Sequence, residues 1–65
     1  MQMRINGEER DVQAADIDVL LKELGLNADH VAIELNHDIL LPADFAQTPL
    51  AAGDTIEIIQ FVGGG

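Results

Sequence analysis

The middle of the chain carries a single apolar stripe with the spacing of an α-helix. The stripe has four members at positions i, i+3, i+4 and i+7: Ile17, Leu20, Leu21 and Leu24. Asp16 precedes the stripe as a candidate N-terminal cap, and Gly25 follows it as a candidate C-terminal cap. The sequence shows one such helix, and in a domain of 65 residues this single helix can cover only one face of a sheet.

Short segments on both sides of the helix have the period-two alternation of half-buried strands. Strands are expected at 1–5, 9–13, 31–35, 39–41 and 55–62. Asn6-Gly7 supplies the tight turn of a first hairpin, and residues 42–47 can form one short helical turn with Phe45 anchored in the core. The sequence therefore predicts short strands around one helix, in the order ββαββ, a short helical turn, then β.

The last expected strand becomes apolar on both faces. Up to Ile58 it alternates, with Glu57 on the solvated face. Ile59 and Phe61 then place large apolar groups on the same face as Glu57. A central strand that is covered on both sides would account for this pattern. Because one helix covers only one face, we favour an exposed docking patch for a partner, made of Ile59, Phe61 and Val62.

The sequence ends on Gly63, Gly64 and Gly65, directly after this strand. Because glycine has no Cβ, such a segment fits through a narrow active-site channel and can present its carboxylate there. A short glycine run is equally typical of a frayed end or of a cloning remnant. We expect a folded domain over residues 1–62 and a flexible glycine tail over residues 63–65.

The charge balance disfavours one class of partner and favours another. Twelve Asp and Glu residues stand against three Lys and Arg residues, which gives a net charge of −9. Phosphate backbones repel such a surface, so nucleic-acid binding is not expected, whereas a basic protein partner is attracted. No signal peptide and no apolar segment of membrane-spanning length is recognisable, so we expect a cytoplasmic protein without membrane contact.

The side chains offer little for catalysis by the chain itself. The sequence has no cysteine, which excludes a catalytic thiol, a thiolate metal site and disulfides. His37 next to Asp38 is interpreted as part of a surface turn rather than as a metal or acid–base site. We therefore expect neither a catalytic residue nor a metal site.

Several short motifs follow one another along nearly the whole chain. They are Ile5-Asn6-Gly7-Glu8, Leu20-Leu21-x-x-Leu24-Gly25, Val31-x-Ile33-x-Leu35-Asn36, Leu50-x-x-Gly53-Asp54-x-Ile56-Glu57-Ile58 and the final Gly64-Gly65. In this order the motifs resemble the ThiS family, the sulfur carriers of thiamin biosynthesis within the ubiquitin-like β-grasp superfamily. The resemblance implies an α+β fold of the β-grasp type, with a mixed sheet of about five strands and one main helix on one face.

The resemblance also implies a role for the tail. In the family, an E1-like adenylating enzyme uses ATP and magnesium to activate the terminal carboxylate, here that of Gly65. Sulfur from a cysteine-derived persulfide converts the acyl-adenylate to a thiocarboxylate, which donates its sulfur to thiazole synthase. Gly63 and Gly64 would thread the tail into the partner. The chain would bind no cofactor of its own and would be a protein co-substrate rather than an enzyme.

Three other functions fit the same residues. The nearest is the small sulfur-carrying subunit of molybdopterin synthase. The second is a ubiquitin-like protein modifier, whose glycine carboxylate ends in an amide with a lysine. The third is a non-covalent β-grasp adaptor with an inert tail. The chemical fate of the tail separates a carrier from a modifier or an adaptor, and the acceptor enzyme separates the two sulfur pathways.

Overall fold

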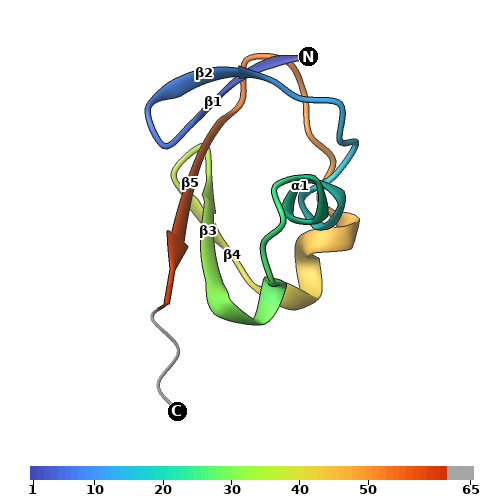
Figure 1. The fold of residues 1–65 in the computed structure, drawn as a ribbon, viewed down its shortest axis with the longest axis vertical. Coiled ribbons are helices and arrows are strands. Elements are labelled where there is room, and N and C mark those ends of the chain that lie inside the picture. The colour runs from blue at the N-terminus through green and yellow to red at the C-terminus, as the bar shows by residue number, and fades with distance from the viewer. Residues whose placement is uncertain (62–65) are drawn as a thin grey trace.

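Within residues 1–61, five strands form one sheet, and one α-helix lies against one of its faces (Figure 1). The computed structural model describes residues 1–61. The elements in chain order are β1 (Gln2–Ile5), β2 (Glu8–Asp11), α1 (Ile17–Glu23), the 3-10 helix η1 (Ala28–His30), β3 (Val31–Leu35), β4 (Asp38–Leu40), the 3-10 helix η2 (Pro42–Gln47) and β5 (Thr55–Gln60). This order confirms the predicted succession of strands, helix, short helical turn and last strand.

The last strand lies in the middle of the sheet. The strand order is β2-β1-β5-β3-β4, with β5 parallel to β1 and antiparallel to β3. The two hairpins, β1–β2 and β3–β4, therefore flank β5 on its two sides (Figure 1). The sheet is mixed and has the β-grasp arrangement that the resemblance implied.

Each hairpin turns through residues with positive φ. Asn6 (φ 51°) and Gly7 (φ 81°) close the first hairpin, as the Asn-Gly pair predicts. Asn36 (φ 49°) and His37 (φ 74°) close the second, although neither is glycine. Asparagine tolerates this left-handed conformation better than most residues, which suits it to the first position of both turns.

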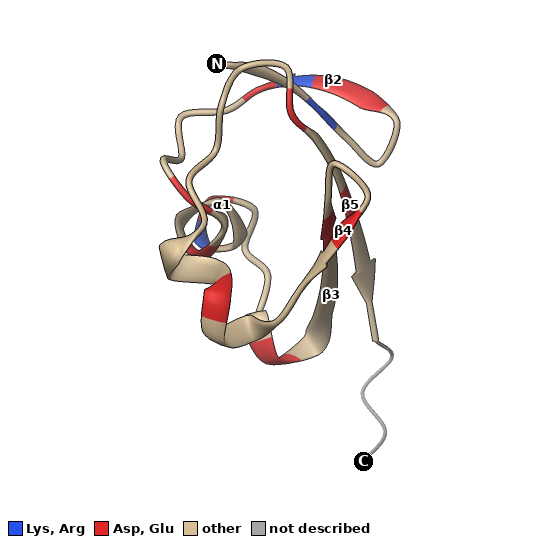
Figure 2. Cartoon of the chain, turned by 180° about the vertical axis from the view of Figure 1, so that it is seen from behind, with Lys and Arg blue, Asp and Glu red and all other residues tan. Residues whose placement is uncertain are grey.

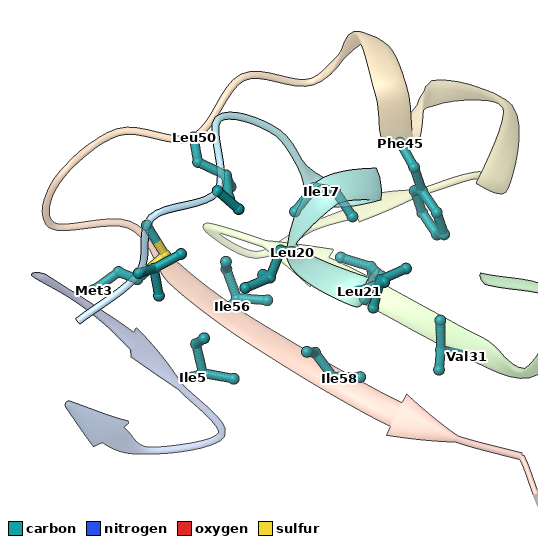
Figure 3. Packing of buried hydrophobic residues seen from close by; sticks show 13 residues of the cluster. Met3, Ile5, Ile17, Leu20, Leu21, Val31, Phe45, Leu50, Ile56 and Ile58 are labelled. Atoms are coloured by element: carbon teal, nitrogen blue, oxygen red, sulfur yellow. The ribbon is translucent and has the colours of Figure 1, made fainter. Parts of the chain in front are cut away.

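The core fills the space between the sheet and α1. Its thirteen buried members are Met3, Ile5, Val12, Ala14, Ile17, Leu20, Leu21, Val31, Ile33, Phe45, Leu50, Ile56 and Ile58. Figure 3 shows side chains of α1 above those of β1 and β5, with Phe45 reaching in from η2. The predicted helical stripe and the Phe45 anchor are thus confirmed. Leu24 is only partly buried because the helix ends at Glu23 and Leu24 is its C-terminal cap.

Some boundaries differ from the prediction. A strand was expected over 9–13, but β2 spans Glu8–Asp11. Beyond it, the Val12 N–H donates to the Met1 carbonyl oxygen (2.8 Å), and the hairpin ends there because Met1 is the first residue. Val12 is buried just beyond the strand. The η1 turn was not anticipated; Asn27 begins it by accepting a hydrogen bond from the Asp29 backbone N–H (2.9 Å). Within residues 1–61, no helix has the length and apolar character of a membrane span.

Candidate functional site

The C-terminal end of β5 leads out of the sheet toward the predicted tail. β5 starts near the end of the molecule that holds the N-terminus and runs to the opposite end (Figure 1). Its pairing with β3 continues one residue further, because the Phe61 backbone N–H donates to the carbonyl oxygen of His30 (2.8 Å). The strand is therefore held by backbone hydrogen bonds up to the last described residue.

Two asparagine side chains fasten β5 from its two sides. The Asn6 Oδ1 accepts from the Ile58 backbone N–H (2.7 Å), and its Nδ2 donates to the Ile58 carbonyl oxygen (3.3 Å). The Asn36 Oδ1 accepts from the Thr55 backbone N–H (2.9 Å), and its Nδ2 donates to a carboxylate oxygen of Asp54 (3.1 Å). Both asparagines come from hairpin turns, so the turn residues also set the position of the strand that leads to the tail.

The face of the sheet opposite α1 carries two rows of side chains. In the first row, Ile59 of β5 lies opposite Ala32 of β3. In the second row, Glu57 of β5 lies opposite Glu34 of β3, and Glu34 lies opposite Ile39 of β4. The burial pattern confirms this face, since Ile56 and Ile58 are buried while Glu57 and Ile59 are exposed.

Large apolar side chains are exposed on this face and next to it. The strand register places Ile39 and Ile59 on the open face, whereas Phe61 follows β5 and lines a separate depression with Leu26 and His30. Four are strongly exposed, namely Ile39 (77%), Leu41 (64%), Ile59 (59%) and Phe61 (55%). A shallow depression of about 90 Å³ lies among Ala32, Ile33, Glu34, Ile39 and Ile59. Ile59 and Phe61 are thus exposed, as a docking patch requires, even though β5 is central in the sheet. Docking at these residues stays a prediction.

Sequence reasoning missed Ile39 and Leu41 as exposed apolar residues. The run Ile39-Leu40-Leu41 has no polar residue to mark an outer face, so its alternation is invisible. Pro42 directly after this run could have indicated that the run is an edge strand or ends there, because proline typically stands at such positions. The other predicted site residues, Val62, Gly63, Gly64 and Gly65, lie outside the described residues.

Acidic residues are distributed over most elements, whereas the basic ones are confined to β1, β2 and α1 (Figure 2). Two of the three basic side chains form exposed ion pairs, Arg4 with Glu9 (3.3 Å) and Lys22 with Asp18 (3.2 Å). His37 is 90% exposed, and its Nδ1 lies 3.9 Å from a carboxylate oxygen of Glu34. No group of three potential metal ligands occurs within residues 1–61.

Comparisons with known proteins agree with this architecture. The model of the ThiS family matches residues 3–65. A solved structure, the thiamine biosynthesis protein (ThiS) from Geobacter metallireducens, superposes with a TM-score of 0.83 at 33% identity, and the match covers 100% of both chains.

Two relatives are informative in different ways. The sulfur carrier protein ThiS of Thermus thermophilus is 31% identical over 61 residues, which cover 94% of this chain and 95% of the relative. A thiazole synthase of Paramagnetospirillum magneticum is 42% identical over 66 residues, which cover 100% of this chain but only 20% of the relative. The chain thus spans about a fifth of the length of that synthase. The full-length family match and the shared fold lead to one conclusion: the chain belongs to the ThiS family.

Proposed function

We propose that this protein is a sulfur carrier of thiamin biosynthesis and that the Gly65 carboxylate is the group that carries the sulfur. The observation that carries the proposal is the family match, which runs from residue 3 to residue 65 and so includes the terminal glycine. The Thermus thermophilus relative is named as a sulfur carrier protein and is of nearly the same length. The protein is then a co-substrate, and its partners supply the catalytic groups.

The chemistry explains why ATP is needed. A carboxylate is a poor electrophile, so the activating enzyme joins the Gly65 carboxylate to AMP and releases pyrophosphate. A persulfide sulfur then attacks the carbonyl carbon and displaces AMP, forming an acyl disulfide. Reduction of the S–S bond by a thiol leaves a thiocarboxylate at Gly65 and yields a disulfide from the thiols. ATP and magnesium belong to the activating enzyme in this scheme.

Thiazole synthase is the acceptor that the comparisons favour. Two proteins named thiazole synthase contain a segment similar to this whole chain, one in Paramagnetospirillum magneticum and one in Magnetococcus marinus. In both relatives the similar segment makes up 20% of the protein. This supports thiazole synthase over a molybdopterin synthase as the partner that takes the sulfur.

The absence of cysteine from the sequence permits a direct test. The protein is incubated with ATP, cysteine and an extract of its source, treated with a thiol-alkylating reagent and mapped by tandem mass spectrometry. We expect an ATP-dependent adduct at Gly65. Mapping is essential, because replacing oxygen by sulfur adds nearly the same mass as oxidation of Met1 or Met3. No adduct, with an extract that charges a known carrier, would exclude the sulfur-carrier function.

Deletion of Gly65 provides the matching control. The core cluster runs from Met3 to Ile58, so the deletion removes none of its members, and we expect an unchanged thermal unfolding midpoint. Loading should be lost, because the carboxylate is then one residue too short to reach the activating site. Sulfur transfer to the shortened protein at the normal rate would contradict the role of Gly65.

A further inference from the structure

Two carboxylates face each other on the open side of the sheet. Glu34 of β3 and Glu57 of β5 are direct cross-strand partners, and both side chains lie on the face opposite α1. Cross-strand neighbours have Cβ atoms about 5 Å apart, and like charges in this position destabilise a sheet. The fold alone gives no reason for the pair, since either residue could be neutral without disturbing the core.

No cation of the described residues 1–61 neutralises both carboxylates. Arg4 forms an ion pair with Glu9 instead, and Lys22 pairs with Asp18 on the helix. Arg10 lines a depression with Leu24 and Leu26, which follow α1. His37 lies 3.9 Å from Glu34, but it is 90% exposed and approaches only one of the two carboxylates. The acidic pair therefore offers four oxygen acceptors at the surface with no internal partner that spans them.

The pair borders the exposed apolar residues of the same face. Ile39 lies opposite Glu34, and Ile59 lies two residues beyond Glu57 on β5. Glu34, Ile39 and Ile59 also line the same depression of about 90 Å³. An apolar floor beside two carboxylates matches a protein surface that presents an apolar side chain next to a cation.

We propose that Glu34 and Glu57 together bind an arginine side chain of the activating enzyme while an adjoining apolar side chain of that enzyme packs on Ile39 and Ile59. Arginine fits better than lysine, because its planar guanidinium presents parallel N–H donors that bridge two carboxylates. The net charge of −9 attracts a basic partner to the molecule as a whole, and the Glu34–Glu57 pair concentrates negative charge on this face. This inference rests on the proposed function, since it assigns the partner that must hold the protein while the tail reacts.

The inference predicts opposite effects on stability and on partner recognition. In Glu34→Gln and Glu57→Gln, the cross-strand repulsion is relieved, so the thermal unfolding midpoint should stay equal or rise. At the same time the protein concentration that gives half-maximal ATP-dependent loading of Gly65 should increase at least about tenfold, because a charge-assisted contact is lost. Damage to the fold would instead lower the thermal unfolding midpoint and also raise the protein concentration needed for half-maximal loading.

The control is Glu23→Gln, an exposed carboxylate at the end of α1, on the other side of the sheet. It changes the net charge by the same amount and should load like the wild type. In the double variant Glu34→Gln/Glu57→Gln, the loss should be smaller than the product of the two single losses, since both residues bind one guanidinium.

The outcomes separate this inference from the proposed function. If the wild type is loaded and all three single variants load alike, the arginine site is wrong while the sulfur-carrier function stands. The inference is also wrong if the midpoint falls in both Glu34→Gln and Glu57→Gln, because the pair is then stabilising. A wild type that the purified activating enzyme fails to load overturns the proposed function, and the inference falls with it.

Discussion

At the scale of single residues, Asn6 connects the first turn of the chain to its last strand. Its side chain forms hydrogen bonds with both the N–H and the carbonyl oxygen of Ile58, 52 positions away in the sequence. The residue register between β1 and β5 ends at the Ile5–Ile56 pair, and the Asn6 side-chain amide continues the hydrogen bonding to β5 at Ile58. Without it, the Ile58 N–H would lose its partner at a partly buried position.

Asn6→Gly tests this contact. Glycine keeps the positive φ of the turn but removes both side-chain hydrogen bonds, so the free energy of unfolding should fall by about 1–2 kcal/mol. Asn36→Gly is the comparison, because its bond to the Thr55 N–H is exposed and water can replace it. We expect the smaller loss there, about 0.5–1 kcal/mol, by urea denaturation. If the two variants lost equal free energy of unfolding, the loss would reflect the turn conformation of asparagine and not the Asn6–Ile58 contact.

The two phenylalanines of the chain have opposite environments. Phe45 is 1% exposed in the core, whereas Phe61 is 55% exposed after β5. Phe45→Ala should lower the free energy of unfolding by about 3–5 kcal/mol, which is much of the total for a domain of this size. Phe61→Ala should change it by less than about 0.5 kcal/mol. Chemical denaturation of both variants checks this, and a large loss in Phe61→Ala would place that side chain in the core.

At the scale of elements, α1 depends on its cap and on the core. The helix has only seven residues, too few to persist alone in water. Asp16 holds its first turn by accepting from the Val19 backbone N–H (2.9 Å). Asp16→Ala should destabilise the protein by about 1 kcal/mol, while Asp16→Asn should retain most of the stability. Thermal unfolding compares the two, and equal midpoints for Ala and Asn would contradict the capping role.

The helix was predictable because its signals are local. An apolar stripe, an acidic cap and a following glycine all lie within ten residues, 16–25. The order in which the strands pair is not local. Period-two alternation identifies β1 and β5 as strands but says nothing about their parallel pairing, which joins the two ends of the chain. That arrangement came from the family resemblance, and the Asn6–Ile58 contact follows from it.

The candidate site was partly predictable for the same reason. Ile59 and Phe61 could be predicted from the sequence, because they share the parity of Glu57, which marks the solvated face of the strand. Ile39 and Leu41 carry no such mark, because both stand in an apolar run; Ile39 is exposed because the strand register places it on the face opposite α1. The Glu34–Glu57 pair likewise depends on a register between strands, which no local pattern contains.

At the scale of the whole molecule, the charge distribution works against folding. Twelve acidic residues against three basic ones give mutual repulsion that a compact state cannot avoid. The ion pairs within residues 1–61 are exposed, such as the N-terminal amine with Asp11 (3.1 Å) and Arg4 with Glu9 (3.3 Å), and exposed pairs contribute little. Repulsion therefore outweighs attraction in the folded state.

Salt should consequently stabilise this protein. Between about 0.01 M and 1 M ionic strength the screening length falls from about 30 Å to about 3 Å, which removes long-range repulsion. We expect sodium chloride to raise the thermal unfolding midpoint by several degrees, since about 1 kcal/mol corresponds to about 4–8 °C at this size. Glu8→Gln/Glu23→Gln removes two negative charges and should respond less to salt. A midpoint that falls with salt would mean that the surface ion pairs outweigh the repulsion, and the acidic surface would then need a different explanation.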